Sequence, residues 1–382
     1  MSKIIYLDNA ASSFPKPAEV IKETERCLRD YCVNVGRSAH QLGTIAAERI
    51  FKTREAVSEL FNIKNPERIA FTLNTTMGLN MGLKGVLKRG DHLIISSMEH
   101  NSISRPAHSL MSEGVELSIA KADKNGEITF KNIKPLIRPN TKMVSLIHAS
   151  NVTGQVNNIS DIGRELKKYN IVFMVDAAQS AGIIPIDVRN AFIDILCFPG
   201  HKGLYGPSGT GGIYVSEKTS VSPIIQGGTG SMSESTQQPG IFPDILESGT
   251  PNVPGISALC EGVNFVINHQ KEILEHETYI SNILVENLSE IPGVKILGRN
   301  GNENTGIVGV NLLHRSPSEV AYLLDKDYNI AARAGFHCSP LSAKTLGLQK
   351  NGSLRFSVGF FNTLKDIDAA SCAMKKILEQ SN

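Results

Sequence analysis

Between residues 69 and 215 the sequence alternates short apolar runs, rich in β-branched residues, with amphipathic segments. The expected strands cover 68–72, 92–97, 115–120, 142–148, 171–175, 192–198 and 211–215, and helices cover 102–112 and 160–169. We place the start of the second helix at Ser160, since serine is a favoured N-cap. Continuous apolar strands separated by helices predict an α/β fold with a mostly parallel, seven-stranded sheet flanked by helices. Ligands of such sheets bind at the carboxyl ends of the strands.

The 382 residues exceed what one ordinary core supports, so two domains are expected. Residues 217–255 are rich in Gly, Ser, Thr, Gln and Pro and predict a long loop, followed by a helix over 256–291 that could bridge two domains. The remainder predicts strands near 294–297, 306–312 and 352–358 and helices near 317–326 and 363–379. We therefore expect a large domain over 16–255 and a smaller α+β domain from 1–15 and 256–382.

Composition excludes several kinds of protein. Lys plus Arg number 39 against 37 Asp plus Glu, and no basic stripe with interleaved aromatics occurs, which argues against nucleic acid as the main partner. No apolar stretch reaches the length of a membrane span, and the N-terminus lacks the pattern of a signal peptide. The six cysteines are scattered without zinc-site spacing, so we expect no metal and a reducing cytoplasm.

Lys202 follows the apolar run 192–198 at once, within a glycine-rich turn that also contains His201. Partial burial at such a strand end lowers a lysine pKa toward neutrality, and a neutral amine is what imine formation needs. Neither a P-loop nor a G-x-G-x-x-G motif is present. The alternative is a surface lysine in a turn.

Asp176 ends the apolar run 171–175, with Gln179 three residues later. A carboxylate at a strand end can pair with a protonated pyridine nitrogen and so let a cofactor ring act as an electron sink. The alternative is an Asp that caps the next turn. Because Asp176 and Lys202 each end a strand of one sheet, together they favour a pyridoxal-phosphate site.

Two further segments suit such a cofactor. Thr75 and Thr76 stand where a strand gives way to a helix, and hydroxyls at a helix N-terminus bind phosphate, although they could equally be simple N-caps. His100 follows another strand and could lie over a flat cofactor ring; a lone histidine there is otherwise structural.

These residues together resemble the class V aminotransferase superfamily of fold-type I pyridoxal-phosphate enzymes. The resemblance rests on Asp176-x-x-Gln179, His201-Lys202, Thr75-Thr76, Glu99-His100-Asn101 and 247–252. Within that superfamily, segments 6–14, 34–43, 150–159, 333–341 and 355–363 are similar to cysteine desulfurases. The motifs cover nearly the whole chain and occur in the family's order.

The resemblance implies definite roles. Lys202 would carry the Schiff base and move protons, and His100 would stack on the ring. Asp176 and Gln179 would contact the ring nitrogen and hydroxyl. The phosphate contacts would be Thr75, Thr76, His201 and, across a homodimer interface, Thr250. Asn151 would contact both the cofactor and the substrate. The other implied substrate-binding residues are Arg355, Arg333 and His40, where an Arg fork suits a carboxylate.

Cys338 lies in a short loop bounded by Gly and Pro, unlike the apolar settings of the other cysteines. Neighbouring Arg333 and His337 could favour the reactive thiolate, which could accept sulfur as a persulfide. The alternative is a loop cysteine without a role. The compact loop resembles the subgroup that also contains selenocysteine lyases. The sequence departs from that pattern at Phe336, where histidine is usual, and at Pro199, where a hydroxyl residue usually contacts phosphate.

The predicted function is a cysteine desulfurase that converts L-cysteine to L-alanine and places the sulfur on Cys338. Selenocysteine lyase or another C–S/C–Se lyase is the nearest alternative, followed by a class V aminotransferase. A catalytically silent binding protein on the same fold is the alternative from another class. A homodimer and a sulfur-acceptor protein are the expected partners, with no nucleic acid or membrane involved.

Overall fold

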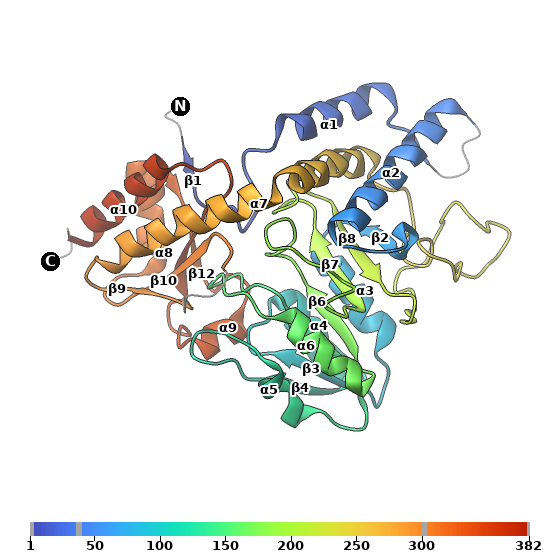
Figure 1. Cartoon of the computed structure of the whole chain (residues 1–382), viewed down its shortest axis with the longest axis horizontal. Helices are drawn as coiled ribbons and strands as arrows, with labels where there is room; N and C mark the ends of the chain where they lie inside the picture. The colour runs from blue at the N-terminus through green and yellow to red at the C-terminus, as the bar shows by residue number, and fades with distance from the viewer. Residues whose placement is uncertain (1–3, 36–39, 299–303, 380–382) are drawn as a thin grey trace.

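The computed structural model describes residues 4–35, 40–298 and 304–379, with a seven-stranded sheet at its centre (Figure 1). In spatial order the strands are β2 (Ile69–Thr72), β8 (Gly211–Val215), β7 (Ile195–Pro199), β6 (Val172–Asp176), β5 (Thr141–Ile147), β3 (His92–Ser96) and β4 (Glu116–Ala120). Strand β8 is antiparallel to both neighbours, and all the other pairings are parallel. The predicted mostly parallel α/β sheet is confirmed.

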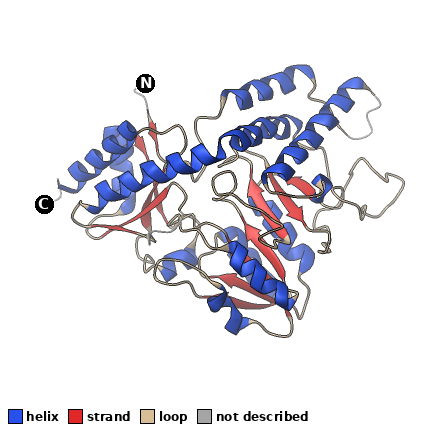
Figure 2. Cartoon of the chain, in the orientation of Figure 1, coloured by secondary structure: helices blue, strands red, loops and turns tan. Residues whose placement is uncertain are grey.

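Helices cover both faces of this sheet, which is why its strands are continuously apolar (Figure 2). In β6, Phe173 and Val175 belong to one buried cluster and Met174 to the other, as the alternation of strand side chains requires. The first face carries α2 (Gln41–Leu60), α6 (Ile159–Leu166) and the start of α7 (Val253–Ser289), and the second carries α3 (Thr75–Val86) and α4 (Asn101–Ser112). Short helices η1 (Pro66–Arg68), α5 (Phe130–Ile133), η2 (Lys134–Leu136) and η3 (Lys167–Tyr169) complete this part.

A second, antiparallel sheet lies at the other end of α7 (Figure 1). Its strands are β12 (Arg333–Gly335), β13 (Ser353–Ser357), β10 (Ile307–Leu312) and β9 (Val294–Ile296). They share an apolar core with α8 (Pro317–Tyr328), α10 (Leu364–Glu379) and the C-terminal half of α7. The N-terminal strand β1 (Ile5–Tyr6) pairs with β11 (Ile330–Ala331), so the start of the chain joins this C-terminal part of the molecule. These elements make up a smaller unit of mixed helices and strands.

Several boundaries differ from the predictions. Strand β7 begins at Ile195 because Phe192, with φ of 52°, has left-handed backbone that a strand cannot contain. Helix α6 is capped by Asn158, whose side chain accepts from Asp161 N, so the prediction of Ser160 was wrong. The sequence analysis also missed α1 (Ala18–Asp30), α2, α9 (Pro340–Thr345), β11 and β12. Across the described ranges, no helix is long and apolar enough to cross a membrane.

Candidate active site

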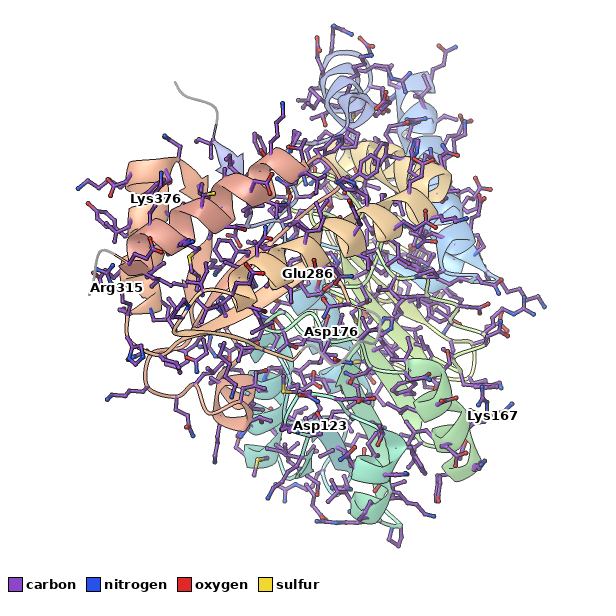
Figure 3. The ribbon with its side chains drawn as sticks, turned by 60° about the vertical axis from the view of Figure 1, so that its left-hand side comes forward. Asp123, Lys167, Asp176, Glu286, Arg315 and Lys376 are labelled. Carbon is purple, nitrogen blue, oxygen red and sulfur yellow. The ribbon has the colours of Figure 1, made fainter. Side chains whose placement is uncertain are left out.

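Asp176 and Lys202 lie at the carboxyl ends of adjacent parallel strands, as the sequence predicts. Asp176 is the last residue of β6, and Lys202 follows the end of β7 by three residues. Burial raises the pKa of Asp176 to about 6, while a 2.9 Å hydrogen bond from Ala178 N and the charge of Lys202 act in the opposite direction. Figure 3 shows Asp176 near the middle of the molecule.

The Lys202 amine makes no hydrogen bond to any residue in the described part of the chain. Burial, followed by the charge of Arg355, lowers the pKa of this amine to about 8, and Asp176 opposes the shift. The turn that carries Lys202 is held by the N-terminal segment, since Ser13 donates to Lys202 O at 2.9 Å and Lys16 Nζ to His201 O at 2.9 Å. The site therefore holds an amine that is readily deprotonated and unengaged.

A small cavity of about 30 Å³ adjoins this amine. Its lining includes Lys202, Gln179, Asn9, Ser357 and Glu277. Gln179 is buried and donates through Nε2 to Ala10 O at 3.1 Å. Gln179 thus lines the same cavity as Lys202, and the charge of Asp176 acts on the Lys202 amine.

The N-terminus of α3 offers polar groups for an anion. The cap of this helix is Asn74, whose side chain accepts from Met77 N at 3.0 Å, so the alternative that Thr75 or Thr76 is the cap is wrong. Thr75 Oγ1 is buried and has no partner among the described residues, and the same holds for His201 Nδ1. A helix N-terminus with unused buried groups beside it is suited to bind phosphate.

His100 caps helix α4, since its Nδ1 accepts from Ser102 N at 3.1 Å. Burial lowers the pKa of His100 to about 4, and the nearby charges of Lys202 and Arg333 act in the same direction. The ring is therefore neutral at physiological pH, and it lies close enough to the Lys202 amine for the two groups to affect each other's charge.

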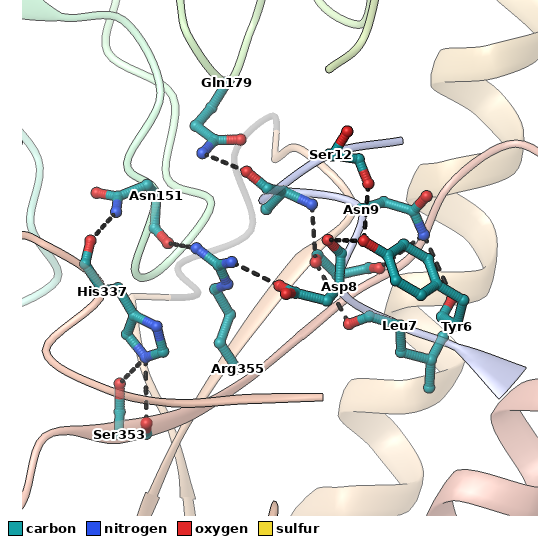
Figure 4. A network of polar contacts seen from close by, with 12 residues as sticks. Tyr6, Leu7, Asp8, Asn9, Ser12, Asn151, Gln179, His337, Ser353 and Arg355 are labelled. Carbon is teal, nitrogen blue, oxygen red and sulfur yellow. Dashed lines mark hydrogen bonds and ion pairs between the residues drawn. The ribbon is translucent and has the colours of Figure 1, made fainter. Parts of the chain in front are cut away.

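Arg355 on β13 connects the second sheet to the first. It is 2% exposed, and it donates through Nη1 to Asn151 O and through Nη2 to Asp8 Oδ1, at 2.9 and 2.8 Å (Figure 4). Asn151 Nδ2 in turn donates to His337 O at 2.6 Å. The predicted substrate-binding residues Asn151 and Arg355 therefore lie together, next to the cysteine loop.

Cys338 is exposed on a tight turn in which His337 and Cys338 both have left-handed backbone, with φ of 49° and 57°. Asn101 N donates to Cys338 O at 2.8 Å, so the start of α4 holds the turn from the other side. The His337 ring is buried against Ser353, and burial with the charge of Arg355 lowers its pKa to about 3. Because this ring stays neutral, His337 adds no positive charge beside Cys338; the prediction that Arg333 and His337 favour the thiolate stays a prediction.

Two predicted residues make no hydrogen bond to the other site residues in the described part of the chain. His40 caps helix α2 by accepting from Gly43 N at 3.1 Å, and Thr250 is exposed just before α7. Residues 36–39 of the motif at 34–43 lie outside the described residues. Arg333 opposes Arg355 in the β12–β13 pairing and is exposed.

Sequence reasoning missed Asp8 and Ser102. Asp8 follows strand β1 closely, as Asp176 ends β6, and an acid at a strand end was the available signal. Ser102 Oγ lies 2.7 Å from Thr76 Oγ1 and 2.9 Å from His100 Nδ1. No sequence pattern distinguishes this serine from its neighbour Ser104.

The groups at this site fit pyridoxal phosphate. An unengaged amine suits its aldehyde, the buried carboxyl of Asp176 suits its ring nitrogen, and the unpartnered Thr75 and His201 atoms suit its phosphate. These three requirements are met at one edge of the sheet.

The chain belongs to the class V aminotransferase family, whose model, described as Aminotransferase class-V, matches residues 5–370. It is similar to proteins named probable cysteine desulfurase. One from Borreliella burgdorferi is 34% identical over 99% of this chain and 92% of that protein, and one from Methanothermobacter thermautotrophicus is 31% identical over 98% and 94%.

Solved structures of cysteine desulfurases have the same fold as this chain. The apo structure of a cysteine desulfurase from Thermococcus onnurineus NA1 superposes with a TM-score of 0.91 at 30% identity, covering 99% of this chain and 95% of that one. The cysteine desulfurase CsdA from Escherichia coli superposes with a TM-score of 0.87 at 28% identity, with the same coverages.

Proposed function

We propose that this protein is a pyridoxal-phosphate-dependent cysteine desulfurase that releases L-alanine from L-cysteine and retains the sulfur on Cys338. One chain of contacts carries the proposal. Asn151 is hydrogen-bonded both to the exposed Cys338 turn and to Arg355, and the charge of Arg355 lowers the pKa of the Lys202 amine. A covalent anchor, a carboxylate clamp and a thiol thus converge. The relatives named cysteine desulfurase, matched over nearly their whole length, support the same activity.

The residues divide the work of holding the cofactor. Lys202 would hold its aldehyde carbon, Asp176 would serve its ring nitrogen, Gln179 its hydroxyl, and His100 its ring. Thr75, Thr76 and His201 would hold the phosphate. When bound, pyridoxal phosphate withdraws electrons from the substrate's α carbon. The free Lys202 amine would accept and return the substrate's α proton at Nζ, which its lowered pKa permits.

Arg355 and Asn151 hold the substrate carboxylate, with the exposed Arg333 beside them. The Cys338 thiolate then attacks the substrate sulfur. A sulfur–sulfur bond forms, the carbon–sulfur bond breaks, and its electron pair stays with the β carbon, which takes a proton to give alanine. The persulfide passes its outer sulfur to an acceptor thiol or carrier protein, which regenerates the Cys338 thiolate.

A homodimer is part of the proposal. Helices α1 and α2 expose large apolar side chains that a single chain leaves uncovered, namely Ile21, Leu28, Leu42, Ile45 and Phe51. Thr250 and His40, which make no hydrogen bond to the other site residues within the described ranges, would act in the active site of the second copy.

The domain division and location are proposed on structural grounds. The separate apolar cores of the two sheets support a large domain over 16–255 and a smaller one from 1–15 and 256–382, with α7 contributing to both cores. All six cysteines are unpaired, which supports a reducing cytoplasm.

Replacing Cys338 tests the function. Cys338→Ala should bind cofactor normally but lose persulfide formation and at least 100-fold in alanine release from L-cysteine, an order-of-magnitude expectation for a lost nucleophile. Cys372→Ala, which removes another exposed thiol, is the matched control. Parental turnover of L-cysteine by Cys338→Ala would contradict the assignment, and turnover of L-selenocysteine alone would indicate a selenocysteine lyase.

The covalent anchor has its own test. Borohydride reduction of protein supplied with pyridoxal phosphate, followed by peptide mapping, should place the label on Lys202. A label on a different lysine, or none, would end the proposal and leave the silent binding protein as the remaining alternative.

A further inference from the structure

Ser102 lies between two residues assigned to different parts of the site. It is the second residue of α4 and is 7% exposed. Its Oγ is 2.7 Å from Thr76 Oγ1, at the proposed phosphate end, and 2.9 Å from His100 Nδ1, at the proposed ring. Two helix N-termini, those of α3 and α4, are thus connected by one hydroxyl.

The direction of each hydrogen bond follows from the backbone. Ser102 N lies 3.1 Å from His100 Nδ1, and a backbone N–H can only donate, so Nδ1 carries no proton. The Ser102 hydroxyl must therefore also donate to Nδ1. Its oxygen is left to accept, and the Thr76 hydroxyl is the donor to it. The order is Thr76 to Ser102 to His100.

Burial keeps the His100 ring neutral, and the charges around it act in the same direction. The largest of these charge effects come from Lys202, Arg333, Arg105 and Arg355, which are all positive. Together with burial they lower the pKa of His100 to about 4, so the ring carries one proton under ordinary conditions. Since Nδ1 is an acceptor, that proton is on Nε2.

We propose that Ser102 is a positioning residue that keeps the proton of His100 on Nε2 and connects this imidazole to the Thr76 hydroxyl. The inference rests on the proposed function for the roles of His100 and Thr76. It specifies that His100 can only offer a proton to the bound substrate from Nε2, because Nδ1 is occupied by two donors. An anion beside Thr76 would attract the Thr76 hydroxyl and so change the second bond of Ser102.

Nitrogen-15 NMR of histidine-labelled protein without cofactor tests the inference directly. The parent should show His100 as the Nε2–H form. In Ser102→Ala one of two donors to Nδ1 is lost, which should raise the share of the Nδ1–H form about fivefold and move the His100 pKa upward by about half a unit to one unit. Ser102→Thr, which restores a hydroxyl, should return both toward the parent.

Ser104→Ala is the matched control, because Ser104 belongs to the same helix and its hydroxyl bonds to Asn101 instead. It should leave the His100 resonances unchanged. An Nδ1–H form in the parent overturns the inference without any variant, and so does a Ser102→Ala protein whose tautomer ratio and pKa match the parent.

Adding inorganic phosphate separates this inference from the proposed function. Phosphate should shift the His100 Nδ1 resonance in the parent, and less so in Ser102→Ala. If phosphate leaves the resonances of His100 and His201 unchanged, the proposed phosphate site fails. The tautomer of His100 would still decide the role of Ser102.

Discussion

The guanidinium of Arg355 donates to the carboxylate of Asp8 across 2.8 Å, which joins the N-terminal segment to the second sheet (Figure 4). With Nη1 bonded to Asn151 O, both terminal nitrogens are engaged and Nε has no partner among the described residues. The proposed carboxylate clamp is therefore held in place from two sides by residues far apart in the sequence.

Asp8→Asn should lower the free energy of unfolding by about 2 to 3 kcal/mol, because it leaves a buried guanidinium without its counter-charge. It should also raise KM for L-cysteine by about tenfold, a change of roughly 1.4 kcal/mol in binding. Denaturant unfolding and steady-state kinetics measure the two effects. Asp161→Asn, which breaks the exposed pair with Arg164, should cost below about 0.5 kcal/mol. If the two variants lose equal amounts of unfolding free energy, the buried pair of Asp8 and Arg355 stabilises the protein no more than an exposed pair does.

The reactivity of Lys202 should depend on pH, and two single substitutions should move the midpoint of this dependence in opposite directions. In protein without cofactor, reductive methylation of Lys202 should rise through pH about 8, since only the neutral amine reacts. The charge of Asp176 raises the Lys202 pKa and that of Arg333 lowers it, so Asp176→Asn should move the midpoint down and Arg333→Ala should move it up. Mass spectrometry of the Lys202 peptide follows the reaction, with the peptide of Lys376 as the surface reference. Shifts in the same direction for both variants would refute this account.

Glu277 should make the protein less stable as pH rises. Burial raises the pKa of this carboxyl from 4.5 to about 8, so between these values the unfolded chain releases a proton that the folded chain keeps. Stability then falls by up to about 1.4 kcal/mol per pH unit from this group. Glu277→Gln should remove this fall, so its advantage over the parent in Tm should grow from pH 5 to pH 8. Glu286→Gln, on the exposed face of the same helix, serves as control, and a constant Tm difference across this range would count against the explanation.

Gly352 should be required for the cysteine loop because of a backbone contact. Gly347 and Gly352 share a φ of 71°, but a Cβ on Gly352 would lie 2.4 Å from the backbone of Gly335, whereas one on Gly347 would meet nothing. Both alanine variants carry the cost of a left-handed residue, and Gly352→Ala should lose about 2 kcal/mol more. It should also change the rate at which a thiol reagent labels Cys338, as measured by peptide mapping. Equal stability of the two variants would mean that the contact relaxes at little cost.

The sequence predicted the large sheet well because its strands are buried on both faces and read as uninterrupted apolar runs. Asp176 and Lys202 followed from their positions at strand ends. Helix α1 was missed because its N-cap residue is Pro17, whose side chain cannot make the capping hydrogen bond that marks the start of a helix in the sequence.

Other features depend on contacts that no local pattern reveals. The partner of Arg355 lies 347 positions away, and the direction in which His337 points is decided by packing against Ser353. Proximity in sequence placed His337 beside Cys338, but the left-handed turn sends its ring into the interior.

The Cys338 turn is fastened at successive carbonyls, one by Asn151 and the next by the first residue of α4. Because neighbouring carbonyls of the turn are both held, the backbone that carries the Cys338 thiol has little freedom to move. Under the proposed function, a sulfur acceptor would therefore have to bring its own thiol to the exposed Cys338 turn.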